Sequence, residues 1–280
     1  MARHFGDLTH AQWEKGRFLC VGLDPDLGKI PEAALRNSRA ETILAFNTAI
    51  IEATMDIAAS FKPNAAFYEA LGEEGAHALR ETVRFINEHA PETPVILDSK
   101  RADIGNTNAG YVMSAFEDLG CDAVTVHPYL GSEALAPFFE RTEKGVIVLC
   151  RTSNPGAGEL QDLDVGGEPL YLALAKRVAQ KWNSNGNCWL VVGATYPHEA
   201  EAIRTVAPDL PFLIPGVGAQ GGDVAAAVHA SKNSNGNGFL VSASRSIMYA
   251  SSGTDFADAA RREALALDSA IKNAVYNNAI

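Results

Sequence analysis

Residues 96–107 read ILDSKRADIGNT, an apolar, strand-like run that ends in a cluster of charged side chains. In a strand, residues two positions apart point to the same side, so Asp98 and Lys100 are expected to project together. A further carboxylate, Asp103, follows just beyond the expected strand. A solvated ion-pair cluster on a loop would explain these charges and would contribute little energy. A functional site is favoured, because charge at the end of a buried strand is costly unless it is used.

Short apolar runs of the same kind recur along the whole chain, and longer helical patterns separate them. The expected strands are residues 18–24, 57–64, 94–100, 123–128, 145–152, 188–195, 211–218 and 238–246. The clearest helical patterns are residues 40–56, 74–89, 168–183 and 255–275. Apolar strands that alternate with helices indicate a parallel sheet covered by helices. Eight such units predict an α/β fold of the (β/α)8 TIM-barrel type rather than an open doubly wound sheet.

Composition limits the classes of function. The chain has 280 residues and shows no linker or composition shift, so a single barrel domain is expected over residues 1–280. A formal net charge of −11 argues against a nucleic-acid partner, because duplex binding requires a basic face. The sequence shows no secretory signal and no apolar run long enough for a membrane span. The four cysteines form no C-x-x-C pair, which favours reduced core thiols in a cytoplasmic protein.

In TIM barrels, chemistry gathers at the C-terminal ends of the strands. The polar residues at or just past these ends are Asp24, Lys62, Asp98, Lys100, Ser153, Gln220 and Arg245. Lys62 would bring a second cation next to Asp98, because the second strand neighbours the third. His127 is interpreted as a structural histidine, and the absence of an H-E-x-x-H motif or a Cys/His cluster leaves a transition-metal site unsupported.

Two loops late in the chain suggest ligand contacts. PGVGAQGGD (215–223) contains G-x-G-x-x-G, but the dinucleotide fingerprint belongs in a first βαβ unit and here follows the seventh expected strand. An anion site shared with Arg245 is favoured, because phosphate sites in these barrels use the loops after strands seven and eight. Residues 151–169 form a long polar loop, typical of a lid or of a disordered segment. Ser153 at its start is either a ligand contact or a turn serine.

Several motifs together resemble one known family. Asp98, Lys100 and Asp103 form D-x-K-x-x-D and are followed by IGNT. The pattern resembles orotidine 5′-monophosphate decarboxylases, in particular the longer-chain, type 2 subgroup, from about Leu19 to Tyr249. The other motifs that carry the resemblance, in the same order, are FKPN (61–64), LCRTSNPG (149–156) and GVGAQGGD (216–223).

The resemblance implies cofactor-free and metal-free decarboxylation of orotidine 5′-monophosphate to uridine 5′-monophosphate in de novo pyrimidine biosynthesis. Lys100 would deliver a proton to C6 of the pyrimidine, and Asp98 would lie beside the substrate carboxylate. Asp24 and Lys62 would bind the ribose hydroxyls, with Lys62 extending the row of charges. The remaining implied contacts are Ser153 with the pyrimidine, Gln220 and Arg245 with the 5′-phosphate, and Ser244, where relatives often carry glycine, with the phosphate through its backbone N–H.

The same resemblance implies a homodimer with shared active sites, in which Asp103, Ile104 and Thr107 enter the site of the neighbouring subunit. Two other functions are weighed against this one. Metal-dependent decarboxylases or aldolases of keto-sugar phosphates also use D-x-K-x-x-D, but they carry a carboxylate where this chain has Lys62. A phosphate-metabolite sensor on the same barrel would leave the charged strand ends unexplained.

Overall fold

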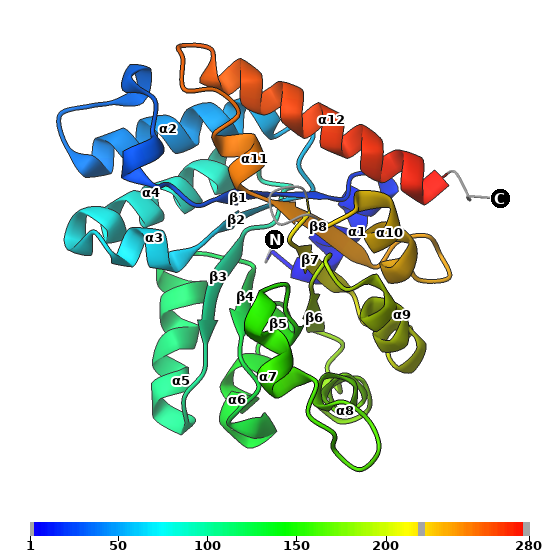
Figure 1. Cartoon of the computed structure of the whole chain (residues 1–280). Helices are drawn as coiled ribbons and strands as arrows, with labels where there is room; N and C mark the ends of the chain where they lie inside the picture. The colour runs from blue at the N-terminus through cyan, green and yellow to red at the C-terminus, as the bar shows by residue number, and fades with distance from the viewer. Residues whose placement is uncertain (1–2, 218–221, 277–280) are drawn as a thin grey trace.

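The computed structural model describes residues 3–217 and 222–276, and within them eight parallel strands form one sheet. The sheet order is β2-β1-β8-β7-β6-β5-β4-β3, so the first and last strands of the chain, β1 and β8, are paired side by side within the sheet (Figure 1). The strands are β1 (Leu19–Leu23), β2 (Ser60–Pro63), β3 (Ile96–Arg101), β4 (Ala123–Val126), β5 (Gly145–Arg151), β6 (Cys188–Val192), β7 (Phe212–Pro215) and β8 (Phe239–Ala243).

The two edge strands, β2 and β3, approach each other and nearly close the sheet into a barrel. Phe61 bridges to Val95 and Asn64 bridges to Asp98, both in parallel pairing. Each expected strand overlaps an observed one, and the predicted (β/α)8 architecture is confirmed. The seam between β2 and β3 also carries Lys62 and Asp98, so closing the barrel brings these two side chains together.

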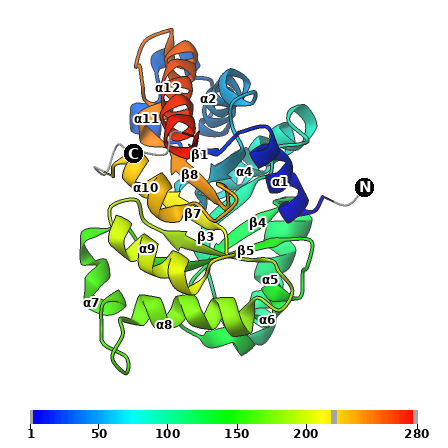
Figure 2. The same cartoon turned by 90° about the vertical axis from the view of Figure 1, so that its right-hand side faces the viewer.

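Helices cover the outside of the sheet, and Figure 2 shows three of them, α8, α9 and α10, following one another around it. The longer helices are α2 (Arg39–Thr54), α4 (Gly72–His89), α5 (Gly105–Val112), α6 (Gly131–Phe139), α8 (Leu170–Arg177), α9 (Pro197–Val206), α10 (Val224–Ser231) and α12 (Phe256–Tyr276). Shorter ones are α3 (Ala65–Glu69), α7 (Gly158–Gln161) and α11 (Arg245–Met248). All four expected helical patterns are found, although 168–183 divides into α8 and a π-helical turn (Val178–Trp182).

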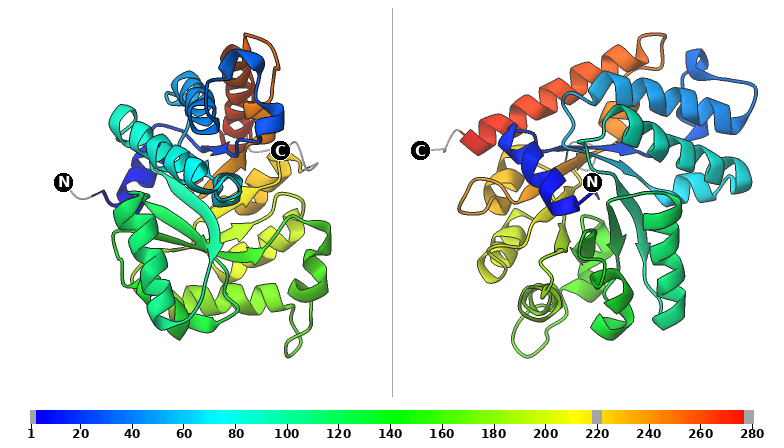
Figure 3. Two further views of the ribbon diagram at one scale, coloured as in Figure 1. Left: turned by 90° about the vertical axis from the view of Figure 1, so that its left-hand side faces the viewer. Right: turned by 180° about the vertical axis from the view of Figure 1, so that it is seen from behind.

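An N-terminal helix that the sequence pattern did not reveal, α1 (Phe5–Glu14), closes the end of the barrel opposite the site. Figure 3, right panel, shows α1 in dark blue across this end. Trp13 stacks on Trp189 of β6 with ring centroids 5.7 Å apart, and its indole N–H donates to the Phe239 carbonyl at 2.9 Å. Phe5 packs where a side chain on Gly145 would collide with its ring. Helix α1 therefore covers the barrel at the N-terminal ends of the strands and leaves their C-terminal ends uncovered.

Buried apolar side chains from successive strands form one cluster, which includes Cys20, Ala59, Ile96, Ala123 and Ile147. All four cysteines are free and buried. Among residues 3–217 and 222–276, no helix is both long and apolar enough to cross a membrane.

Candidate active site

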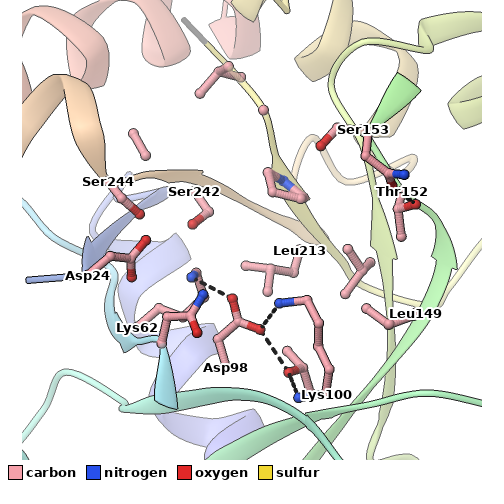
Figure 4. Close-up of a pocket in the computed structure, with 18 of the residues that line it drawn as sticks. Asp24, Lys62, Asp98, Lys100, Leu149, Thr152, Ser153, Leu213, Ser242 and Ser244 are labelled. Carbon is pink, nitrogen blue, oxygen red and sulfur yellow. Dashed lines mark hydrogen bonds and ion pairs between the residues drawn. The ribbon is translucent and has the colours of Figure 1, made fainter. Parts of the chain in front are cut away.

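Three charged side chains form a row at the C-terminal ends of β2 and β3. The Lys62 ammonium lies 2.9 Å from Asp98 Oδ2, and the Lys100 ammonium lies 2.6 Å from Asp98 Oδ1. Figure 4 shows the two lysines on opposite sides of the aspartate. The side chain of Lys62 is 6% exposed and that of Asp98 is 11% exposed, whereas that of Lys100 is 50% exposed. Lys100 is thus the more accessible of the two cations, although both line the same cavity.

The row stays ionised despite its burial. Burial would lower the pKa of Lys62, but the charges of Asp98 and Asp24 outweigh it and raise this pKa above its ordinary value. Burial would likewise raise the pKa of Asp98, but Lys62 and Lys100 hold it well below its usual range. At neutral pH the Lys62 ammonium and the Asp98 carboxylate are therefore both charged. Fixed charge in a partly desolvated site acts more strongly than the same charge in water.

Lys100 has an unusual backbone. Its φ is +48°, and among the described residues it is the one non-glycine with a positive φ. A left-handed conformation costs an L-residue about 1–2 kcal/mol, so the surroundings must hold it. Asp98 and Lys100 do project to the same side, as predicted. This part of β3 is not a regular pleated strand, however, because its register with β4 shifts between Leu97 and Arg101.

These side chains open into a cavity of about 510 Å³. One wall is polar and carries Lys62, Asp98 and Lys100, while Leu149, Val191 and Leu213 supply apolar surface inside it. A volume of this size suits a small molecule with polar and flat apolar parts. The predicted site residues that line this cavity are Asp24, Lys62, Asp98, Lys100, Ser153, Ser244 and Arg245.

Asp24 and Ser244 lie beside β1 on the rim of the cavity. The Oδ1 atom of Asp24 is buried and has no hydrogen-bond partner among the described residues, so it can accept one from a ligand hydroxyl. Ser244 fits because residue 22 is glycine: a Cβ on Gly22 would lie 1.8 Å from the Ser244 hydroxyl oxygen. The Ser244 side chain is therefore accommodated by the neighbouring strand β1.

Ser153 and Arg245 come from loops after β5 and β8. A Cβ on Gly193 would lie 2.8 Å from the Ser153 backbone, so this glycine lets the loop pass close to β6 and into the cavity. Arg245 is exposed at the start of α11, and no carboxylate pairs with it in the part of the chain that the structure describes. Gln220, which was predicted beside Arg245, falls outside the described residues.

Three predicted residues do not line the cavity of their own chain. Asp103, Ile104 and Thr107 lie past the end of β3, at the start of α5. The Asp103 carboxylate accepts from the Ile104 backbone N–H at 2.7 Å, and Ile104 is 61% exposed. Asn108 fixes this turn by donating to the Asp103 carbonyl at 2.6 Å and to the Ala134 carbonyl at 2.5 Å.

Several residues of the cavity were not predicted from the sequence. Thr125 on β4 donates to Asp98 Oδ1 at 2.9 Å, and Asn64 follows Lys62 on the rim. Gln161 on α7 folds back over the loop and accepts from the Thr152 N–H at 2.9 Å. Asn64 and Thr125 sit at strand ends, so the rule that selected Lys62 could have found them. Gln161 could not be found in this way, because its place depends on how residues 151–169 fold.

His127, interpreted as structural, has an Nδ1 atom that is buried and unpaired among the described residues, and it does not line the cavity. Within the same residues, no group of three or more His, Cys, Asp and Glu side chains is placed to hold a metal ion.

A nearly closed (β/α)8 barrel with buried charged side chains at its strand ends defines the protein as a barrel enzyme. Residues 17–260 match the family described as Orotidine 5'-phosphate decarboxylase / HUMPS. The chain is 50% identical over 260 residues to the orotidine 5′-phosphate decarboxylase of Cellvibrio japonicus, an alignment that covers 93% of this chain and 94% of the relative. It is 51% identical over 249 residues to that of Herpetosiphon aurantiacus, covering 89% and 90%.

The solved structure of Leishmania donovani OMP decarboxylase superposes with a TM-score of 0.81 at 39% identity, covering 95% of this chain and 99% of that one. The chain belongs to the orotidine 5′-phosphate decarboxylase / HUMPS family. The resemblance found in the sequence motifs is confirmed.

Proposed function

We propose that the protein decarboxylates orotidine 5′-monophosphate to uridine 5′-monophosphate, in de novo pyrimidine biosynthesis. The observation that carries this proposal is the row Lys62–Asp98–Lys100 at the mouth of the barrel. The names of relatives that are about half identical over nearly the whole chain support the same reaction.

The chemistry of this substrate requires a fixed cation at C6. When the C6–CO₂ bond breaks, the electron pair stays on C6 as a localised carbanion. The Lys100 ammonium can stabilise that charge as it develops and then transfer a proton to C6, acting as general acid. Because its side chain is half exposed, Lys100 can regain a proton from solvent. Asp98 keeps the ammonium in place, and Lys62 balances the charge of Asp98 from the buried side.

The remaining cavity residues suit the rest of the nucleotide. We assign Asp24 and Lys62 to the ribose hydroxyls and Ser153 to the pyrimidine. Arg245, Gln220 and the Ser244 backbone N–H are assigned to the 5′-phosphate. The guanidinium of Arg245 is exposed and has no carboxylate partner among the described residues, which supports this assignment because it can form charge-assisted hydrogen bonds with a phosphate. Binding energy gained at the phosphate can then serve the reaction at C6.

Replacing Arg245 with alanine should separate binding from chemistry. A hydrogen bond to a charged group contributes about 1.5–3 kcal/mol, so Arg245→Ala should lower kcat/KM for orotidine 5′-monophosphate on the order of 10²-fold. Orotidine, which has no phosphate, should be processed equally slowly by both proteins. Arg262→Ala is the matched control, because Arg262 is an exposed arginine paired with Asp255. Equal impairment on both substrates would remove Arg245 from the phosphate site.

We infer a homodimer with shared active sites as the working unit. Asp103, Ile104 and Thr107 do not line the cavity of their own chain, and Ile104 is an exposed apolar side chain. Helices α5 and α6 pack side by side, and the residues just before α6, Tyr129 and Leu130, are 82% and 44% exposed. Exposed apolar side chains gathered in this way are typical of protein interfaces.

Three further statements complete the proposal. The whole chain acts as one decarboxylase domain, the protein works in the cytoplasm, and its ligand is a nucleotide rather than nucleic acid. The arrangement of all described strands in one sheet supports a single domain. Free, buried cysteines are in keeping with a reducing compartment.

The rival function is a metal-dependent reaction on a keto-sugar phosphate, within the same family type. Against it, both carboxylate oxygens of Asp98 are engaged by ammonium groups, which leaves this carboxylate poorly suited to share a Mg²⁺ ion. The deciding experiment incubates the purified protein with orotidine 5′-monophosphate and follows the loss of its absorbance, with chromatography to identify uridine 5′-monophosphate. Turnover of a keto-sugar phosphate without turnover of the nucleotide would support the rival.

A further inference from the structure

The pairing between β3 and β4 is interrupted opposite Thr125. Leu97 pairs with Val124 and Arg101 pairs with Val126, so three residues of β3 face one residue of β4. Such a bulge leaves backbone groups of the longer strand without their usual ladder partners. The three residues of β3 in this interval are Asp98, Ser99 and Lys100, and two of them belong to the charged row.

The Thr125 hydroxyl provides a partner for the backbone N–H of Lys100 in this interrupted part of the ladder. It accepts the backbone N–H of Lys100 at 2.9 Å and donates to Asp98 Oδ1 at 2.9 Å. A hydroxyl can do both, because it carries one donor hydrogen and two acceptor lone pairs. The same Oδ1 atom accepts from the Lys100 ammonium at 2.6 Å. Thr125 therefore holds Lys100 at its backbone and, through Asp98, at its charged end.

We propose that Thr125 is a positioning residue for the decarboxylation, which fixes the left-handed backbone of Lys100 and aims its ammonium into the cavity. The changes in kcat and KM expected below depend on the proposed function. It names a residue outside the D-x-K-x-x-D motif, on the neighbouring strand.

Packing alone does not explain a threonine here. Thr125 is 1% exposed and lies between Val124 and Val126, which belong to the apolar core. Valine would fill the same volume without a buried hydroxyl to satisfy. The hydroxyl is explained by its two hydrogen bonds. A strained backbone conformation persists when several contacts determine it together. The Lys100 side chain is half exposed and is held by its ion pair with Asp98, which Thr125 also contacts.

The kinetic test compares Thr125→Val, which removes the hydroxyl at constant shape, with Thr125→Ser, which retains it. Because the lost bonds involve charged groups, kcat of Thr125→Val should fall roughly 10- to 10²-fold. The KM should change less than about threefold, because ribose and phosphate contacts are untouched. Thr125→Ser should recover kcat to within about fivefold of wild type. Thr54→Val, which removes another buried threonine hydroxyl, bonded to the Ile50 carbonyl of α2, should leave both constants unchanged.

A second comparison asks whether Thr125 acts through Lys100. Removing the hydroxyl in a Lys100→Ala background should lower kcat no further, because two changes that act through one group are not additive. Thr125→Ala serves in place of Thr125→Val if the valine variant fails to fold. A Thr125→Val protein that keeps more than half of the wild-type kcat would overturn the proposal. So would a serine variant as impaired as the valine variant, or an additive loss in the double variant.

A third measurement does not depend on the reaction. Peptide mapping after brief treatment with trinitrobenzenesulfonate reports how freely each lysine amine reacts. Loss of the Thr125 bonds should raise labelling of Lys100 at least about threefold relative to Lys15, an exposed lysine paired with Glu92 at the other end of the barrel. If wild type fails to convert orotidine 5′-monophosphate, the proposed function fails while this arm still tests Thr125. Unchanged labelling of Lys100 would overturn the positioning role itself.

Discussion

Lys100→Ala should lower kcat by roughly 10⁴-fold or more, because it removes both the cation that faces the carbanion and the proton donor, each worth a factor of about 10² or more. The loss should be in chemistry rather than in binding. Arg245 and Ser244 are untouched by the substitution, so affinity for uridine 5′-monophosphate should largely survive. The measurement is kcat from the absorbance assay together with calorimetric binding of the product.

Lys15→Ala is the matched control for this prediction. Lys15 is another lysine in an ion pair, 41% exposed at its side chain, but it lies at the closed end of the barrel. Its replacement should leave kcat unchanged. A Lys100→Ala protein that retains a tenth of the wild-type kcat would remove Lys100 from the chemistry and with it the mechanism proposed for the charged row.

Mixing two nearly inactive proteins, Lys100→Ala and Asp103→Ala, should restore about a quarter of the wild-type activity, because random exchange makes about half of the dimers mixed. In a two-fold dimer each site would combine Lys100 of one chain with Asp103 of the other. A mixed dimer then holds one site with both lesions and one site with neither.

If Asp103 served its own chain, every site in the mixture would keep one lesion and mixing would restore nothing. Mass spectrometry of the intact dimers shows whether subunits have exchanged, so an absence of recovery after verified exchange contradicts the shared site. A mixture of Lys100→Ala with Lys15→Ala is the control. Each of its sites is either intact or lacks only Lys100, so mixing should leave the activity at the average of the two parent proteins.

The barrel could be predicted from sequence because each strand is a short apolar run between helical patterns, and one rule about strand ends selected Asp24, Lys62 and Asp98. These residues stand at positions that follow from the local pattern alone. The position of helix α1 could not be predicted in the same way. Its residues Phe5 and Trp13 close the end of the barrel only through contacts with Gly145 and Trp189, which are far away in the sequence.

The left-handed backbone of Lys100 was also beyond a pattern-based prediction. A regular strand places Asp98 and Lys100 on one side, so their proximity was predicted correctly. The regular-strand argument did not include the register shift or the positive φ of Lys100. The actual geometry depends on the register between β3 and β4 and on the hydroxyl of Thr125, which the sequence shows only as one polar residue in AVTV. Side chains that act across strands are found when the pairing is known.

In the proposed mechanism, the row Lys62–Asp98–Lys100 carries out the decarboxylation with protein charges alone. The most direct test measures turnover of orotidine 5′-monophosphate by protein dialysed exhaustively against EDTA, beside untreated protein and dialysed protein given Mg²⁺. Since Asp98 is engaged by two ammonium groups at 2.9 and 2.6 Å, we predict equal rates in all three samples. Activity that disappears on dialysis and returns with Mg²⁺ would contradict the claim.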